Sequence, residues 1–157
     1  SAVGLRVNYD IERDCPGETT CTGIPGRFGI CLENGDFEKA LAMLRESGIE
    51  LAGLHLHQSS KTRSLAIYRS IAGTSVQIGR EFGLDALRYV DIGGGFFGGS
   101  FFPGKPTYAE YAETVCTTLR KFYSPEKTAL ILELSSQRRW IISRASSTSA
   151  RSEDTGS

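Results

Sequence analysis

Hydrophobic residues follow two patterns that alternate along the chain. Short apolar runs, which are typical of strands covered on both faces, alternate with longer segments in which apolar residues return every three or four positions. Between residues 35 and 48, for example, Phe37, Leu41 and Leu44 are spaced for one helical face. The pattern predicts four strands, at 2–11, 49–57, 87–92 and 128–134, and three helices, at 35–48, 64–82 and 107–123.

Polar residues and glycines at the expected helix ends support these boundaries. Ser64 suits the N-cap of the second helix, and Gly83 suits its C-terminal end. Thr107 is followed three residues later by Glu110, the arrangement of a capping box at the start of the third helix. The order of elements is therefore β-α-β-α-β-α-β, which predicts the α/β fold class.

Alternating strands and helices predict parallel β/α repeats with right-handed crossovers. Such a sheet is either open and doubly wound or part of an eightfold barrel. Four strands make about half of a TIM-type (β/α)8 barrel, so we expect a partial barrel from an internal fragment of a longer protein. In both architectures function lies at the C-terminal ends of the strands. Four candidates lie there, at Asn8, His57, Gly93 to Gly95 and Glu133.

Three consecutive glycines, Gly93, Gly94 and Gly95, follow the third strand in the stretch DIGGGFFGGS. Without Cβ atoms, their backbone can approach a ligand closely and turn several N–H groups toward an anion such as a phosphate. A simple glycine-rich turn is the alternative. The stretch is not a nucleotide P-loop, because no Gly-Lys-Ser/Thr follows, and its spacing differs from the dinucleotide fingerprint.

His55 and His57 lie two residues apart at the end of the strand 49–57, so both point to the same face. A metal site is one interpretation, although a metal needs further ligands and the chain has only these 2 histidines. A hydrogen-bonded histidine in the core is the second. The third is a flat aromatic wall against a planar cofactor, with Ser59 and Ser60 offering hydroxyl groups to a phosphate.

Glu133 lies near the end of the last expected strand, where a carboxylate has to be solvated or paired. A protonated ring nitrogen would be a suitable partner. A phosphate cradle, an imidazole wall and this carboxylate together match the chemistry of pyridoxal 5'-phosphate, whose reactivity proteins tune at the ring nitrogen.

Composition and charge limit the classes of binding partner and the cell compartment that we expect for this protein. The formal net charge is zero, which gives no electrostatic reason to expect nucleic acid or an anionic membrane as a partner. No apolar run approaches the ~20 residues needed to span a bilayer, and the first residues lack the pattern of a signal peptide, so we expect none. The 4 cysteines are expected to be free thiols in a reducing compartment, so we expect a cytoplasmic protein.

The chain resembles the barrel-type (fold-type III, alanine-racemase-like) pyridoxal-phosphate-dependent decarboxylases that act on diaminopimelate, ornithine, arginine and related amino acids. The motifs GLRVN, GRFGI, GLHLHQSS, DIGGGF and ILE occur in the family's order between about Gly4 and Glu133. The combination of an HxH strand with DIGGGF is specific, whereas each motif alone is weak.

The resemblance implies a role for each matching position. His57 would stack on the pyridine ring and Glu133 would pair with the ring nitrogen, so these two are candidate catalytic residues. Ser60 and the backbone of Gly93 to Gly95 would bind the phosphate, and Arg6 would lie in the cofactor pocket. The implied reaction releases carbon dioxide from Cα of an amino-acid substrate through a Schiff base with the cofactor. The full-length parent would be a head-to-tail homodimer.

The chain also departs from the family pattern. The family's Schiff-base lysine lies upstream of these residues, so we nominate no lysine and expect the chain alone to be inactive. Ser59 replaces the glycine of a His-x-Gly-Ser turn, and LSSQRR replaces the family's Pro-Gly segment after the glutamate. We therefore predict a pyridoxal-phosphate-binding barrel at 1–134 and a disordered or non-native tail at 135–157.

These features predict a fragment of a decarboxylase of a basic or diamino amino acid, in the diaminopimelate, ornithine, lysine or arginine class. Two other functions stay open at this point. A non-catalytic or decayed relative would keep the barrel and act by binding. A metal-dependent barrel hydrolase would use His55 and His57, but the lack of further histidines argues against it, and we assign no metal ligands.

Overall fold

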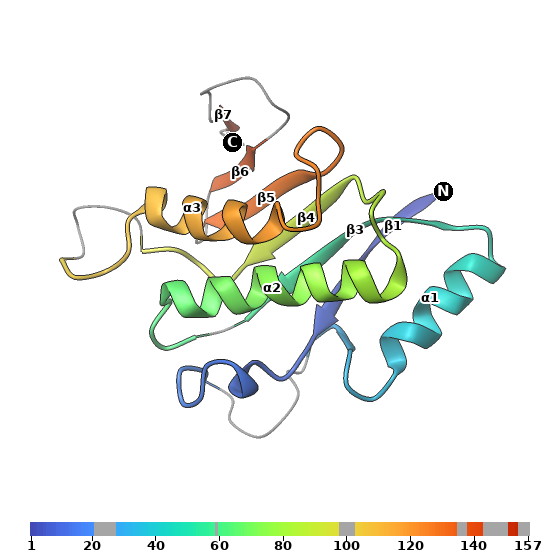
Figure 1. Ribbon diagram of the computed structural model, residues 1–157, viewed down its shortest axis with the longest axis horizontal. Coiled ribbons are helices and arrows are strands. Elements are labelled where there is room, and N and C mark those ends of the chain that lie inside the picture. The colour runs from blue at the N-terminus through green and yellow to red at the C-terminus, as the bar shows by residue number, and fades with distance from the viewer. Residues whose placement is uncertain (21–27, 59, 98–102, 135–137, 143–150, 154–157) are drawn as a thin grey trace, which may run out of the picture.

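The computed structural model describes residues 1–20, 28–58, 60–97, 103–134, 138–142 and 151–153 (Figure 1). Its strands are β1 (Ala2–Asn8), β2 (Ile30–Cys31), β3 (Glu50–His57), β4 (Tyr89–Gly93), β5 (Ala129–Leu134), β6 (Arg138–Ile142) and β7 (Arg151–Glu153). They form one sheet in the order β2-β1-β3-β4-β5-β6-β7. The first five strands in this order are parallel, and β6 and β7 continue the sheet in antiparallel pairing.

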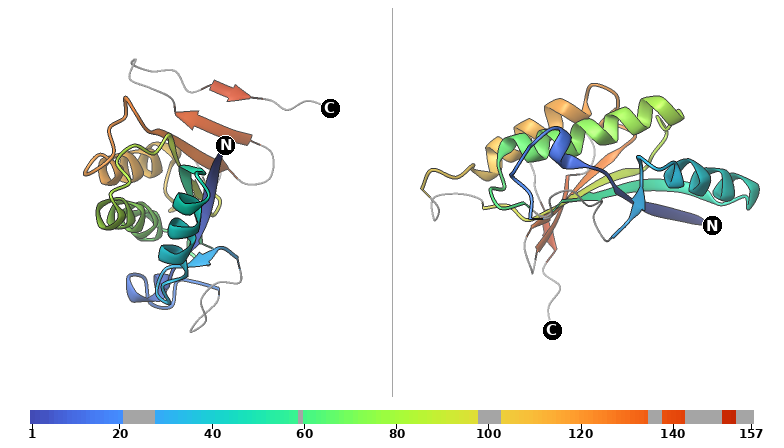
Figure 2. Two further views of the ribbon diagram at one scale, coloured as in Figure 1. Left: turned by 90° about the vertical axis from the view of Figure 1, so that its right-hand side faces the viewer. Right: turned by 90° about the horizontal axis from the view of Figure 1, so that it is seen from below.

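Helices connect the parallel strands: η1 (Ile11–Arg13, a 3-10 helix), α1 (Asp36–Glu46), α2 (Leu65–Phe82) and α3 (Tyr108–Leu119). The three α-helices lie on one side of the sheet, and none of the described helices covers the opposite face (Figure 2). No helix in the described part of the chain is long and apolar enough to cross a membrane. The parallel β/α repeats predicted from the sequence are confirmed.

The helix ends follow the capping residues expected from the sequence. Ser64 Oγ accepts a hydrogen bond from the Ile67 backbone N–H at 3.3 Å, and Gly83 ends α2 with a φ of 66°. Thr107 and Glu110 form the capping box of α3, in which the Glu110 carboxylate accepts from the Thr107 N–H at 2.7 Å. All expected strands and helices are present, although the first strand and the last helix end earlier than predicted.

The strand β2 was not predicted. It pairs in parallel with β1, with Ile30 opposite Val7 and Cys31 opposite Asn8. Two residues are too few to produce a recognisable period, so the pattern of apolar positions could not reveal this strand.

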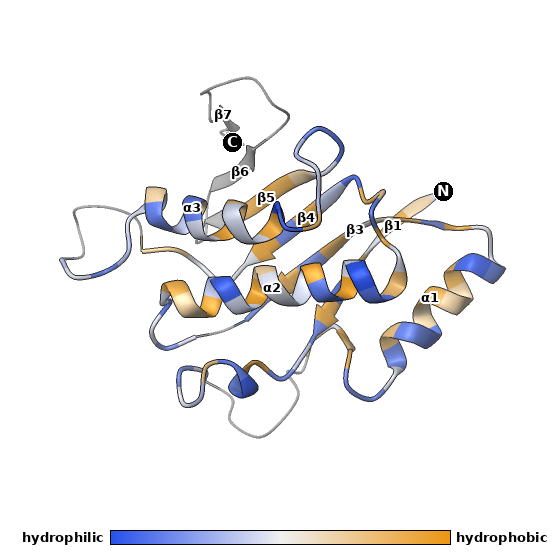
Figure 3. Ribbon diagram, viewed as in Figure 1, coloured by the Kyte–Doolittle hydropathy of each residue, from blue (hydrophilic) through white to orange (hydrophobic). Residues whose placement is uncertain are grey.

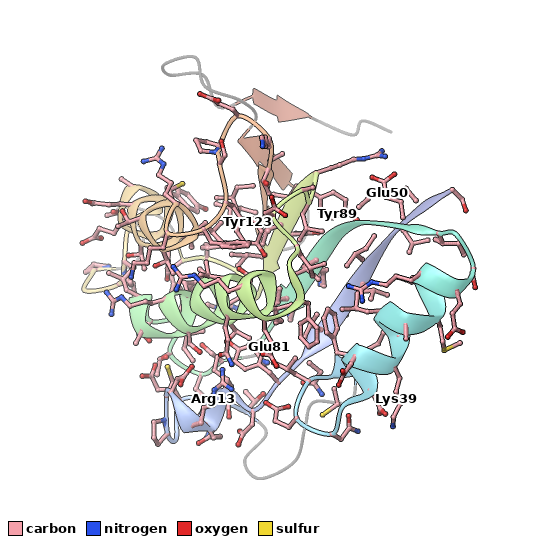
Figure 4. All side chains as sticks on the ribbon, turned by 45° about the vertical axis from the view of Figure 1, so that its right-hand side comes forward. Arg13, Lys39, Glu50, Glu81, Tyr89 and Tyr123 are labelled. Atoms are coloured by element: carbon pink, nitrogen blue, oxygen red, sulfur yellow. The ribbon has the colours of Figure 1, made fainter. Side chains whose placement is uncertain are left out.

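The hydrophobic core lies between the sheet and the helices α1, α2 and α3. The loop after α3 is fastened to α2 by Tyr123, whose hydroxyl donates to the Ser75 carbonyl at 2.8 Å (Figure 4). Stretches of apolar residues run along β3, β4 and β5 (Figure 3). The core residues of the central strands are Leu54, Leu56, Val90 and Ile92, each 0% exposed.

The described residues beyond 135 form strands. β6 pairs antiparallel with β5, with Ile142 opposite Leu130, and β7 pairs with β6. Composition predicts disorder for this stretch because its serines and charged residues show no period, and for these eight residues the structure differs from that prediction. The rest of 135–157 lies outside the described residues, and the non-native origin of the tail stays a prediction.

Candidate functional site

Strand register brings three polar side chains into one row across the sheet. Arg6 of β1 pairs with His55 of β3, and His55 pairs with Asp91 of β4. Neighbouring residues of a strand point to opposite faces, so this row lies on the face opposite the buried Leu54 and Val90. It is the face that the described helices leave uncovered (Figure 2).

His55 and Asp91 contact each other inside this row. Nδ1 of His55 lies 3.1 Å from Oδ2 of Asp91, and the two side chains are 20% and 13% exposed. A carboxylate only accepts hydrogen bonds, so Nδ1 of His55 carries the proton. Two buried atoms of the row, Arg6 Nε and Asp91 Oδ1, have no hydrogen-bond partner among the described residues. Buried polar atoms are rarely left unpaired, so each of these two atoms could take a further polar partner.

His57 is the last residue of β3 and lies nearer the C-terminal edge of the sheet than His55. The two imidazole rings are stacked, with centroids 6.2 Å apart and planes inclined by 25°. His57 pairs in register with Gly93, the last residue of β4. The histidine and the glycine loop, which the sequence suggests as separate candidates, are therefore neighbours.

The glycine loop after β4 has a backbone that side chains would disturb. Gly94 and Gly95 have φ angles of 126° and 75°. A Cβ atom on Gly94 would lie 2.9 Å from the Gln58 carbonyl oxygen and 3.2 Å from the Tyr68 hydroxyl oxygen. The ends of β3 and β4 thus approach each other too closely for a side chain, and such a glycine backbone suits an anion cradle.

An aromatic cluster behind the glycine loop was missed by the sequence analysis. The Tyr68 hydroxyl donates to the Gly95 carbonyl, and the Tyr68 and Phe96 rings stack with centroids 4.5 Å apart. Tyr111 of α3 packs edge-on against both rings, with centroids 4.9 Å away. Burial raises the pKa of Tyr68 above its usual range, so the hydroxyl stays a donor. These aromatic residues resemble ordinary core residues of helices, and only the fold shows that they support the loop.

Ser60 lies in the turn between β3 and α2. Its Oγ accepts a hydrogen bond from the Arg63 backbone N–H at 2.6 Å, and Ser60 forms an isolated antiparallel bridge with Thr19. Ser59, which replaces the family's glycine, lies outside the described residues. Arg63 was not a candidate from the sequence, and it is conspicuous only through its backbone, with a φ of 48°.

Position 133 of β5 reaches the level of the glycine loop. Leu132 pairs with Ile92, so the next position, Glu133, lies beside Gly93. Alternation along the strand assigns position 133 to the face that carries Asp91. The parallel sheet therefore brings a carboxylate-bearing position to the edge where His57 lies.

Arg6 lies deeper in the row than the other candidates, at the level of His55. Its guanidinium carbon is 5.3 Å from the centroid of the Phe28 ring. Among the described residues no group of three or more His, Cys, Asp or Glu side chains is arranged to hold a metal ion.

Parallel β/α repeats with polar groups at the carboxyl ends of the strands assign the protein to the class of parallel α/β domains, which includes the β/α barrels. Residues 1–135 match the family model described as "Pyridoxal-dependent decarboxylase, pyridoxal binding domain". This match covers most of the chain, so the protein belongs to that family, and pyridoxal phosphate is the cofactor of its domain. The family and cofactor expected from the sequence motifs are thereby confirmed.

Two related proteins give the comparison more detail. The diaminopimelate decarboxylase of Actinosynnema pretiosum subsp. auranticum is 34% identical over 71 residues, which are 45% of this chain and 16% of that protein. The crystal structure of a mutant diaminopimelate decarboxylase from Helicobacter pylori, complexed with L-lysine, has a TM-score of 0.60 and 21% identity over 85% of this chain. That similarity shows the fold, a partial TIM-type barrel. The chain spans only 33% of the solved relative.

Proposed function

We propose that the chain forms the central part of the cofactor site of a decarboxylase that removes carbon dioxide from Cα of a basic or diamino amino acid. The observation that carries the proposal is the register of His57 with Gly93, which puts a flat imidazole beside the glycine loop. Both lie within the residues that match the pyridoxal-binding family. Two relatives named as diaminopimelate decarboxylases support the diaminopimelate, ornithine, lysine or arginine class of substrate.

The residues present fit pyridoxal phosphate. The backbone N–H groups of Gly93 to Gly95 and the hydroxyl of Ser60 would hold its phosphate, because glycines have no Cβ in the way, and Gly94 and Gly95 adopt positive φ angles. The His57 imidazole would lie against the flat ring, and the Glu133 carboxylate would keep a proton at the ring nitrogen. Arg6 has a buried Nε without a partner among the described residues. When bound, the cofactor supplies the electron sink for breaking the bond to the carboxylate.

The surrounding residues orient this site and shield it from water. His57 stands at the end of a strand, which positions a side chain more rigidly than a loop does. His55 stacks behind it and is itself held by Asp91 at 3.1 Å. On the other side of the glycine loop, Tyr68 and its aromatic neighbours exclude water from the backbone that would contact the phosphate.

The 157-residue chain alone should bind the cofactor rather than catalyse. It spans 33% of the solved relative and 16% of the curated one, so the remaining parts of such a site lie outside these residues. The resemblance to the family also puts the Schiff-base lysine upstream. We therefore expect no release of carbon dioxide from this chain, and we propose a homodimer only for its full-length parent.

Binding of pyridoxine 5'-phosphate tests the proposal. This analogue has an alcohol in place of the aldehyde, so it cannot react with the lysines of the chain, and calorimetry measures contact alone. His57→Ala removes the proposed ring contact and should weaken binding roughly threefold to tenfold. Tyr108→Ala, which removes a ring that is 51% exposed on α3, is the matched control and should leave the affinity unchanged.

A second candidate function has one structural observation in its favour. β6 pairs antiparallel with β5, where a complete barrel would continue with a parallel strand. A non-catalytic relative that keeps part of the barrel and acts by binding other partners would fit this arrangement. The same calorimetry separates the two, because failure of the wild-type chain to bind pyridoxine 5'-phosphate would contradict the cofactor-site proposal and favour the non-catalytic relative.

A further inference from the structure

Arg63, in the turn that leads into α2, has an unusual backbone conformation. Its φ is 48°, and it is the only non-glycine residue with a positive φ in the described part of the chain. Side chains other than those of glycine, asparagine and aspartate rarely adopt this region. A strained arginine next to a candidate site suggests that its position serves the site.

Neighbouring groups hold this conformation from both sides of the residue. The Arg63 N–H donates to Ser60 Oγ at 2.6 Å, and the Arg63 carbonyl accepts from the Tyr111 hydroxyl at 2.6 Å. The next residue, Ser64, caps α2 by accepting from the Ile67 N–H at 3.3 Å. The backbone conformation of Arg63 is therefore fixed by Ser60 on its N-terminal side. On its C-terminal side it is fixed by the N-cap of α2 and by Tyr111 of α3.

The Arg63 side chain lies against the glycine loop. A Cβ atom built on Gly95 would be 3.4 Å from the Arg63 guanidinium carbon and 3.6 Å from its Nε and Nη2 atoms. The guanidinium carbon is also 4.8 Å from the centroid of the Phe97 ring, and the Lys105 ammonium nitrogen is 5.1 Å from the same centroid. Two cations therefore gather beside the loop.

None of the ion pairs between described residues involves Arg63. The Glu18 carboxylate is bound in this turn, where it accepts hydrogen bonds from the hydroxyls of Thr62 and Ser64. The Arg63 guanidinium thus has an aromatic ring and a glycine backbone around it. Its planar set of N–H donors is suited to the oxygens of a phosphate.

We propose that the Arg63 guanidinium binds the phosphate of the cofactor, together with Ser60 and the glycine loop. This inference rests on the proposed function and names the cation of that site. It accounts for three observations together: the strained backbone of Arg63, the position of its guanidinium over the Phe97 ring, and its place beside Gly95 of the glycine loop.

The test compares pyridoxine 5'-phosphate with pyridoxine, which lacks only the phosphate. Calorimetry on the full chain gives the ratio of the two affinities for wild type, Arg63→Gln and Arg63→Gly. Both variants should lower the preference for the phosphate ester on the order of tenfold or more, with pyridoxine binding unchanged. Glycine tolerates a φ of 48° without strain, so Arg63→Gly should be at least as stable as Arg63→Gln and excludes misfolding as the cause.

Arg69→Gln is the control for general charge, since it removes one exposed cation from the adjoining helix α2 and should keep the preference. If Arg63→Gln and Arg63→Gly keep the wild-type preference for the phosphate ester, the inference is wrong and the cofactor-site proposal stands. If the wild-type chain binds neither compound, the cofactor-site proposal fails and the role of Arg63 fails with it.

Discussion

The two faces of the sheet differ in what their residues do. On the helix-covered face, Leu54 and Ile92 are 0% exposed and pack in the hydrophobic core. On the other face, the same strands carry His55 and Asp91, which are 20% and 13% exposed and contact each other. Figure 3 shows the apolar character of β3 and β4, which polar residues interrupt.

Polar residues within apolar strands indicate where the chemistry of a parallel sheet lies. Strands of such a sheet are normally apolar on both faces. A polar residue inside an apolar strand loses contact with water, which costs free energy unless a partner or a ligand forms hydrogen bonds with it. Arg6, His55 and Asp91 interrupt three neighbouring strands at the same level, and the register turns these interruptions into one row. One face therefore supplies stability, and the other supplies the candidate site.

The largest expected effect comes from the helix-covered face. Leu54→Ala deletes a fully buried side chain and should lower the free energy of unfolding by about 2–5 kcal/mol. His55→Ala, one residue further and on the opposite face, should cost only about 1 kcal/mol, chiefly through the unpaired Asp91 carboxylate. Equilibrium unfolding in urea, followed by circular dichroism, measures both. If both variants lost the same free energy of unfolding, the conclusion that stability comes mainly from the helix-covered face would be wrong.

A smaller effect is expected from packing on the polar face. Gly53 pairs in register with Tyr89, and a Cβ atom on Gly53 would overlap the Tyr89 ring. Figure 4 labels Tyr89 on the sheet near Glu50. Gly53→Ala should therefore reduce stability by about 1–3 kcal/mol through overpacking. The double variant Gly53→Ala with Tyr89→Ala should show strong coupling in a thermodynamic cycle.

Gly73→Ala is the control for this prediction. Gly73 lies inside α2, and a Cβ atom there would meet no atom within 4 Å. Alanine is the better helix former, so this variant should raise stability by about 0.5–1 kcal/mol. If Gly53→Ala also raised stability, the close packing of Tyr89 on the polar face would be refuted.

Most of the fold was predictable because its elements are long enough to show a period. The apolar run that ends at His57 and the helix that Ser64 caps are examples, since both combine a pattern with a boundary residue. The two-residue strand β2 and the strands β6 and β7 were not predictable. The first is too short to show a period, and the others occur in a stretch rich in serine and charge.

The candidate site was predictable in its position but not in its details. Parallel strands bring their carboxyl ends to one edge, so the approach of His57 to Gly93 could be expected from the order of elements. Asp91 offered a signal, a charged residue within an apolar strand, that sequence analysis did not use. Tyr68 and Arg63 could not be found in this way, because their contacts depend on the course of loops.

The smallest effect on stability, and the sharpest test of the polar face, concerns the proton of His55. Its Nδ1 lies 3.1 Å from the Asp91 carboxylate, so the neutral ring should have its proton on Nδ1 rather than Nε2. Asp91→Leu removes the acceptor and should release the ring to the Nε2–H form, while stability changes by no more than about 1 kcal/mol.

Nitrogen-15 NMR can measure this without ambiguity, because the chain has only 2 histidines. Spectra recorded with both rings neutral report the tautomer of each ring. Asp91→Asn keeps an acceptor oxygen and should keep the Nδ1 proton, whereas Asp85→Asn removes an exposed carboxylate and should change nothing. An Nε2–H tautomer of His55 in the wild type would refute the pairing. His57 stacks on His55. A shift of the His57 signals in Asp91→Leu would therefore show that the contact between His55 and Asp91 helps to position His57 beside the glycine loop.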